Sequence, residues 1–260
     1  MLPSIDRVSS LIREVAMAEI LPRFQKLTAS DISEKKPGQL VTTADLESER
    51  ILTQHLADLL PGSVVVGEEG VAAEPGRLDL IGGEAPVWVV DPVDGTQNFA
   101  DGKPIFATMV ALLIEQRAVA AWIYEPVTDR MARAELGSGA FVEGERMQVA
   151  AAVPLSQMRG RLSGRTAKKL DGKVGAIFNQ RCAGHEYLAV ASGAAHFAVF
   201  RRLNPWDHAP GELIVREAGG YSRRLDGTPY AASEIDASLL LAPDERSWTV
   251  LRDLVLELAP

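Results

Sequence analysis

Cysteine is nearly absent from this sequence, which has Cys182 as the single thiol among its 260 residues. One cysteine cannot form an intramolecular disulfide, and this usage is typical of proteins from a reducing compartment. No cysteine motif of a nucleophile or a metal site surrounds Cys182, so we interpret it as a small buried apolar residue. The sequence therefore predicts a cytoplasmic protein whose fold depends on its core.

Long apolar runs and excess positive charge are also absent. No stretch reaches the roughly 18 uncharged apolar residues of a membrane span, and the amphipathic segment 1–20 lacks the apolar centre of a signal peptide. Lys and Arg total 27 against 35 Asp and Glu, for a net charge of −8. Nucleic-acid binding depends on Lys and Arg that neutralise phosphates. We therefore expect neither a nucleic-acid polymer nor a membrane as partner, whereas a small phosphate ester remains possible beside metal ions.

Hydrophobic residues make up 47% of the chain, enough for one large domain or two closely packed halves. Hydrophobic periodicity and turn residues predict helices over residues 4–28, 43–60, 186–192, 205–218 and 243–258. Strands are predicted over residues 63–67, 87–91, 105–114, 118–124, 130–135, 140–142, 174–178, 196–201 and 239–242. Residues 71–83 are rich in Gly and acids and are expected to form a loop. An α+β fold follows, with subdomains 1–150 and 151–260 divided in a stretch rich in Ala, Pro, Ser and Gly.

The stretch Trp88–Thr96 carries the strongest chemical signal. An apolar strand delivers Asp91 to its carboxyl end, and the chain then turns, so that Asp91 and Asp94 can face one point. The carbonyl of Val93 lies between them, and Gly95 permits close approach of a ligand to the backbone. Carboxylates and a carbonyl suit a hard cation bound beside a phosphate. A turn with two solvated acids is the alternative for the short pattern taken alone.

The whole string Asp-Pro-Val-Asp-Gly-Thr resembles the metal-binding signature of the inositol monophosphatase family, which usually has Ile or Leu where this chain has Val93. Further elements of the family occur in order along nearly the whole chain. They are Val41–Asp45 before the second helix, Gly67-Glu68-Glu69 after a strand, Trp206-Asp207 at a helix start, and Glu217–Gly220 at its end. Taken singly, the acids of these elements could also be solvated loop residues or first-turn helix residues.

The resemblance implies a layered α/β/α/β/α sandwich of the inositol monophosphatase and sugar phosphatase type. It also implies two or three Mg²⁺ ions, one held by Glu68, Asp91 and the Val93 carbonyl, and a second by Asp91, Asp94 and Asp207. Catalytic roles in orienting the attacking water are implied for Glu68, Thr96 and Asp45. Phosphate binding is implied for Asp94, Gly95, Thr96 and Asp207. By the same resemblance, a homodimer is expected.

The second half departs from the family pattern where the substrate is selected. Phe200 aligns with an acidic residue that contacts inositol hydroxyls, and a phenyl ring cannot accept those hydrogen bonds. Gly184 and His185 replace the small residues of the family near the same pocket. The alternative is that Phe200 is a core residue of its strand. We therefore expect hydrolysis of a small phosphate monoester, with an inositol monophosphatase-like enzyme as the first hypothesis.

Two alternatives remain open at the level of sequence, because a fold does not determine a substrate. One is a sibling phosphatase that acts on histidinol phosphate, a 3′-phosphoadenosine nucleotide or a sugar bisphosphate. The other is a regulatory protein that binds metal or phosphate without catalysis.

Overall fold

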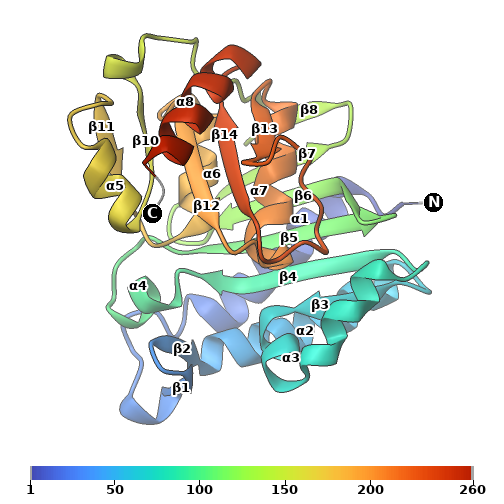
Figure 1. Ribbon diagram of the computed structural model, residues 1–260. Coiled ribbons are helices and arrows are strands. Elements are labelled where there is room, and N and C mark those ends of the chain that lie inside the picture. The colour runs from blue at the N-terminus through green and yellow to red at the C-terminus, as the bar shows by residue number, and fades with distance from the viewer. Residues whose placement is uncertain (1, 259–260) are drawn as a thin grey trace.

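Helices and sheets alternate in five layers in the computed structural model, which describes residues 2–258 (Figure 1). The outer helices α1 (Ile5–Val15) and α2 (Thr43–Leu59) cover one face of a seven-stranded sheet. Helices α6 (Ala183–Ala191) and α7 (Pro205–Glu217) lie between this sheet and a five-stranded one. Helices α5 (Gly164–Leu170) and α8 (Glu245–Glu257) cover the far face of the second sheet. The expected α+β class and its layered sandwich are confirmed.

The first sheet has the order β3-β4-β5-β6-β7-β8-β9. Its strands are β3 (Val64–Gly67), β4 (Val87–Asp94), β5 (Ala107–Ile114), β6 (Arg117–Glu125), β7 (Arg130–Glu135), β8 (Gly139–Val142) and β9 (Glu145–Arg146). Only β3 and β4 pair in parallel, and the rest form an antiparallel meander. The sequence predicted this meander, because short connections between strands force antiparallel neighbours.

The second sheet has the order β11-β10-β12-β14-β13. Its strands are β10 (Arg159–Arg161), β11 (Ala176–Phe178), β12 (Phe197–Arg201), β13 (Tyr221–Arg224) and β14 (Ser238–Ala242). A separate hairpin is formed by β1 (Ile32–Lys36) and β2 (Gln39–Thr42). The two large sheets share one hydrophobic cluster around α6 and α7, so the two halves of the chain have a common core.

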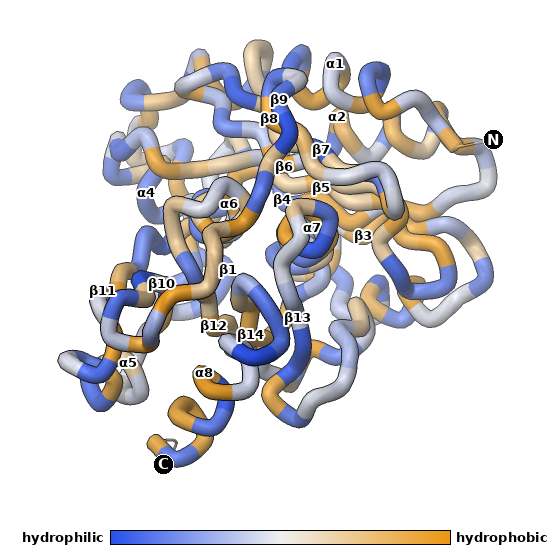
Figure 2. Tube along the Cα trace, turned by 90° about the horizontal axis from the view of Figure 1, so that it is seen from above, coloured by the Kyte–Doolittle hydropathy of each residue, from blue (hydrophilic) through white to orange (hydrophobic). Residues whose placement is uncertain are grey.

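Alternation of side chains along β4 explains the layer order. Trp88 and Val90 face the outer helices, whereas Val87 and Val89 face the middle layer. A strand buried on both faces must be apolar at successive positions, and β4 is buried along its whole length. Figure 2 shows hydrophobic residues along the central strands and a hydrophilic β9 at the edge of the sheet.

Helices α6 and α7 approach closely in the middle layer, because Gly211 leaves room for the Tyr187 ring. A Cβ atom on Gly211 would lie 2.0 Å from that ring. This contact fixes α7, whose first turn carries one of the predicted metal ligands. Within residues 2–258, no helix is long and apolar enough to cross a membrane.

Two predictions of secondary structure were wrong. Residues 71–83, expected as a loop, contain the end of α3 (Glu68–Ala73) and a 3₁₀ helix, Pro75–Gly82. The amides of Glu69 and Gly70 donate to the distant Glu49 carboxylate, at 2.8 and 2.6 Å, and this tertiary cap has no local signal. The helix expected over residues 4–28 is shorter than predicted. Its α-helical part is Ile5–Val15, and a π-helical turn, Ala16–Ile20, follows. Strands β10 and β13 and helix α5 were not anticipated.

Candidate metal centre

Three acidic side chains from separate elements converge at one edge of the first sheet. Glu68, Asp91 and Asp207 each offer an oxygen, and these oxygens lie within 4.8 Å of one another. Because β3 and β4 are parallel and pair through Gly67 and Val90, the residues that follow them, Glu68 and Asp91, reach the same edge. Asp207 arrives from the first turn of α7. The structure thus brings together three of the residues that the sequence proposed as ligands.

The chain bends sharply after Asp91. The Val93 amide donates to Asp91 Oδ1 at 3.0 Å, and the Thr96 hydroxyl donates to the Val93 carbonyl at 3.0 Å. Gly95 has φ 90°, and a Cβ atom there would lie 3.0 Å from the Ile105 carbonyl. Any larger residue would therefore be both strained and crowded. The bend leads directly into the short helix α4 (Thr96–Ala100).

Asp94 joins the two halves of the molecule. Its Oδ2 accepts hydrogen bonds from the Gly184 amide at 2.6 Å and from the Cys182 thiol at 3.0 Å. Asp94 is buried, and it is not one of the three acids whose oxygens lie within 4.8 Å of one another. The predicted burial of Cys182 is confirmed, but the sequence did not reveal its hydrogen bond to Asp94. Burial, followed by the charge of Asp94, raises the pKa of this thiol well above its usual value.

Asp45 lies in the interior, at the start of α2. Its Oδ2 accepts hydrogen bonds from the Thr42 amide and hydroxyl, at 2.8 and 2.5 Å, which completes a capping box. Its Oδ1 accepts from the Thr96 hydroxyl at 3.2 Å. Asp45 therefore serves as a helix cap and also contacts Thr96. Burial raises the pKa of Asp45 to about 6.

Lys35 is a residue of the site that the sequence analysis missed. The β1–β2 hairpin places its Nζ 2.7 Å from Glu68 Oε1 and 2.7 Å from Glu69 Oε1. Burial alone would lower the pKa of Lys35, but the two carboxylates outweigh it and raise this pKa. The sequence around Lys35 carries no signal for such a contact, because the partners lie more than 30 residues away.

Like charges dominate the electrostatics of the site. Burial, and then the charges of Glu68, Asp94 and Asp207, raise the pKa of Asp91 well above its usual value. Burial and Glu68 raise the pKa of Asp207 to about 8. Carboxylates crowded in this way bind protons or cations. Since the three converging groups offer only oxygen atoms, the donor set fits a hard divalent cation such as Mg²⁺.

The residues expected around the substrate lie in different surroundings. The His185 ring is turned toward Glu125, with Nδ1 at 3.2 Å from Oε1, and toward the Phe106 carbonyl. Phe200 is 3% exposed and stacks on Tyr187 with ring centroids 4.6 Å apart. The Arg161 guanidinium lies 4.6 Å from the centre of the same ring. Phe200 thus lies in the core. This agrees with the second of the two interpretations of the sequence, in which Phe200 is a core residue of its strand and not a substrate contact.

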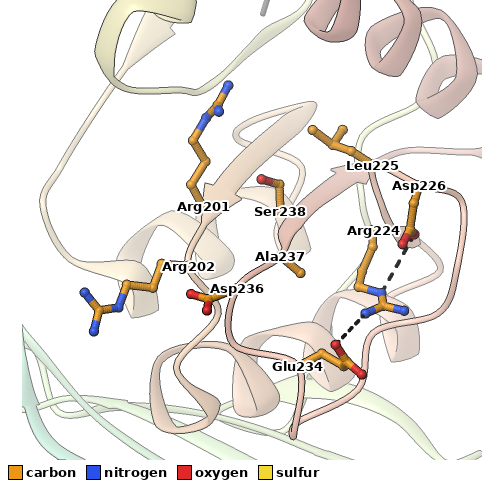
Figure 3. A pocket seen from close by; sticks show the side chains of 9 residues that line it. All are labelled: Arg201, Arg202, Arg224, Leu225, Asp226, Glu234, Asp236, Ala237 and Ser238. Carbon is orange, nitrogen blue, oxygen red and sulfur yellow. Dashed lines mark ion pairs between the residues drawn. The ribbon is translucent and has the colours of Figure 1, made fainter.

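A cavity of about 570 Å³ opens beside the ends of β12 and β14 (Figure 3). Arg224 lies within it and pairs with Glu234 at 3.4 Å and with Asp226 at 3.8 Å. Arg201 and Arg202 line the opposite part. None of the predicted metal ligands lines this cavity, so it is separate from the carboxylate cluster.

Comparison with known proteins agrees with this geometry. A family model described as the inositol monophosphatase family matches residues 4–255. The chain belongs to this family. Its members are metal-dependent phosphoric monoester hydrolases, and the carboxylate cluster of this chain could hold a metal ion.

Individual relatives support the assignment. An inositol-1-monophosphatase of Rhizobium meliloti is 33% identical over 89% of this chain and 88% of its own length. A fructose-1,6-bisphosphatase/inositol-1-monophosphatase of Thermotoga maritima is 31% identical, with 76% and 77% covered. A solved inositol monophosphatase of Thermotoga maritima has a TM-score of 0.83 at 26% identity, with 98% of this chain and 99% of that chain covered.

Proposed function

We propose that this member of the inositol monophosphatase family hydrolyses a small phosphate monoester by Mg²⁺-dependent attack of water. The convergence of Glu68, Asp91 and Asp207 within 4.8 Å carries the proposal. Such a cluster is costly to fold without cations. Divalent ions bound by such carboxylates can activate water and stabilise the attacking and leaving oxygens in phosphate ester hydrolysis.

The ligand assignment is the one that the family resemblance implies, and the convergence of Glu68, Asp91 and Asp207 supports part of it. Glu68, Asp91 and the Val93 carbonyl would hold one ion, and Asp91, Asp94 and Asp207 a second, among two or three in total. The Val93 carbonyl accepts one hydrogen bond, from Thr96, and its second lone pair is free for a ligand. When bound, these ions would lower the pKa of a water molecule and offset charge on the phosphoryl group.

The protein's own groups would orient the reacting water. The Thr96 hydroxyl is held between the Val93 carbonyl and Asp45 Oδ1, at 3.0 and 3.2 Å. This hydroxyl has one proton, so a water that donates to its oxygen would be fixed in direction. Glu68, whose Oε1 accepts a hydrogen bond from Lys35, would accept a proton of that water, as the family resemblance implies. Asp45 would act through Thr96 rather than on the substrate.

The phosphate group would lie beside the bend at Asp94, Gly95 and Thr96, opposite Asp207. The substrate class is small phosphate esters, with inositol phosphates the first candidates. The sibling substrates are histidinol phosphate, 3′-phosphoadenosine nucleotides and sugar bisphosphates. A cytoplasmic location, supported by the single cysteine, and a homodimer, supported only by the family resemblance, are part of the same proposal.

A phosphate-release assay over a panel of these esters tests the proposal directly. We expect hydrolysis with Mg²⁺ and none in excess EDTA. Asp207→Asn is expected to be inactive, whereas the exposed control Asp253→Asn should behave as the native protein does. Phosphate release in excess EDTA, by protein that elemental analysis shows to contain no metal, would contradict the role of Mg²⁺. Binding of Mg²⁺ without hydrolysis of any ester would favour the regulatory alternative.

A further inference from the structure

Arg181 lies beside the metal-binding bend, in the segment between β11 and α6. The Asn98 amide group donates to the Gln180 carbonyl at 2.9 Å, and the neighbouring Cys182 thiol donates to Asp94. A Cβ atom on Gly95 would lie 3.4 Å from the Arg181 carbonyl. The backbone of Arg181 is thus packed directly against the bend that carries Asp94, Gly95 and Thr96.

The backbone of Arg181 adopts a left-handed conformation, with φ 55°. This conformation is sterically unfavourable for residues with a Cβ atom, and only Gly, Asn and Asp adopt it routinely. A hydrogen bond from the Arg181 amide to Asn179 Oδ1, at 2.9 Å, helps to hold it. A strained residue at the edge of an active site points to a role for its side chain, because Gly would remove the strain.

The guanidinium of Arg181 makes no hydrogen bond or ion pair within residues 2–258, and the residue is exposed. Its charge contributes only weakly elsewhere, as the last of the causes that lower the pKa of the exposed Asp101. The other cations close to the site are engaged, since Lys35 is bonded to Glu68 and Glu69, and Arg161 pairs with Glu186 at 2.7 Å. Unlike Lys35 and Arg161, Arg181 is therefore a cation beside the bend that has no hydrogen-bond or ion-pair partner among residues 2–258.

We propose that Arg181 is a specificity-determining residue that binds a second anionic group, on the alcohol part of the phosphate ester. This inference rests on the proposed phosphatase function and narrows its substrate class. Carboxylates surround the reaction site, so a substrate that brings a second anion needs an additional positive partner. A guanidinium suits this task because its donors pair with both oxygens of a carboxylate or phosphate.

Arg202 is the alternative candidate for binding the second anionic group. It also has a left-handed backbone, with φ 62°, and is exposed. Its carbonyl accepts from His208 Nε2 at 3.2 Å, and its side chain lines the cavity that also contains Asp236 (Figure 3). Acidic residues already share that cavity, whereas the Arg181 segment contacts the metal-binding bend. Arg202 therefore serves as a matched control.

The test uses two matched pairs of esters. In one pair, 3-phosphoglycerate has a carboxylate where glycerol 3-phosphate has an alcohol. In the other, fructose 1,6-bisphosphate has a second phosphate that fructose 1-phosphate lacks. We expect the native enzyme to favour the anionic member of at least one pair. The pair that shows the preference identifies carboxylate or phosphate as the second group.

Arg181→Gly removes the charge and suits the left-handed backbone, so its melting temperature should equal or exceed that of the native protein. We expect this variant to lower kcat/KM for the preferred ester with a second anionic group about 10- to 100-fold, mainly by raising KM. The kcat/KM for the matched ester without a second anionic group should not change. Arg202→Gly should leave both values unchanged. An unchanged preference in Arg181→Gly, or its loss in Arg202→Gly instead, would overturn the inference.

Failure of the proposed function has a different signature. It would appear as no hydrolysis of any ester by the native protein with Mg²⁺. Calorimetric titration of 3-phosphoglycerate and fructose 1,6-bisphosphate into native and Arg181→Gly protein with Mg²⁺ then decides the role of Arg181. Tenfold weaker binding by the variant would support it, and equal binding would refute it.

Discussion

The acidic residues of the site differ in the hydrogen-bond partners of their carboxylate oxygens. Asp45 uses both oxygens for hydrogen bonds within the protein, whereas Asp94 uses Oδ2 for Cys182 and Gly184. Glu68 is paired with Lys35. A carboxylate with one oxygen fixed by the protein holds its other oxygen in a defined direction, which favours ligation of a cation.

Replacement of Asp94 by Asn separates folding from metal binding. The amide oxygen can still accept from the Gly184 amide and the Cys182 thiol, but the amide nitrogen cannot ligate a cation. We expect a melting temperature close to that of the native protein and at least about tenfold weaker activation by Mg²⁺. Phosphate release over a Mg²⁺ titration measures this. Asp101→Asn is the control, since Asp101 is exposed and bonds only to Gln97 and Lys103. Native turnover at limiting Mg²⁺ would show that Asp94 is not a ligand.

Phe200 is expected to matter for stability. Its ring is 3% exposed and packs between Tyr187 and Arg161. Phe200→Ala should lower the free energy of unfolding by about 3–5 kcal/mol, because it leaves a cavity in the core. Chemical denaturation measures the loss, with Val127→Ala at an exposed site as control. A loss below about 1 kcal/mol together with altered substrate preference would instead indicate a pocket residue.

Whole elements position the ligands through long-range contacts. Helix α3 carries Glu68 at its first position, and the Glu49 carboxylate of α2 accepts hydrogen bonds from the amides of Glu69 and Gly70. Gly67 permits this, since a Cβ atom there would lie 2.2 Å from Glu49 Cδ. Helix α2 therefore positions α3 through the Glu49 side chain, which caps the N-terminus of α3.

Glu49→Ala should weaken both stability and metal binding. We expect a loss of about 1–2 kcal/mol in the free energy of unfolding, as for removal of a helix cap. Glu68 would lose its fixed position, and the affinity for Mg²⁺ should fall about 10- to 100-fold, as for loss of a group that supports a ligand. Denaturation and calorimetric titration with Mg²⁺ measure the two effects. Glu47→Ala, at an exposed position of the same helix, should change neither. Unchanged Mg²⁺ affinity in Glu49→Ala would show that α3 needs no such support.

Several carboxyl groups lie close together in the interior of the molecule. The stability of the protein therefore depends on pH and on bound metal. Burial, and then the charge of Glu68, raise the pKa of Asp207 to about 8. The native state therefore binds more protons than the unfolded chain near pH 7, and metal-free protein must lose stability as pH rises. The buried His208, with a pKa lowered to about 3 by burial, acts in the opposite sense only below about pH 6.5.

We expect the melting temperature of EDTA-treated protein to fall between about pH 7 and about pH 8.5. Mg²⁺ should raise it, and more so at the higher pH, because ions that bind the folded state alone stabilise it by mass action. Calorimetric scans at both pH values, with and without Mg²⁺, measure this. A metal-free protein that becomes more stable at the higher pH would contradict the proposed proton binding.

The two subdomains, proposed at 1–150 and 151–260, are expected to unfold together. The first sheet ends with β9 at Arg146 and the second begins with β10 at Arg159. Both nevertheless pack on α6 and α7 in one cluster, so neither half can bury its core alone. Denaturant unfolding followed by far-UV circular dichroism and by tryptophan fluorescence should give coincident transitions. Two separate transitions would show that the halves fold independently.

The family resemblance implied the layers, whereas the residue pattern by itself determined the α+β class, most of the strands and the stretch Trp88–Thr96. These features are local, since alternation, apolar runs and turn residues act over a few neighbours. Predictions failed where distant groups complete an element, as with Glu49 at the start of α3. Tertiary packing alone decided that Lys35 contacts Glu68, that Cys182 and Gly184 hold Asp94, and that Phe200 lies in the core. Each of these contacts joins segments far apart in the chain, and only the closed packing of two sheets around α6 and α7 brings them within bonding distance.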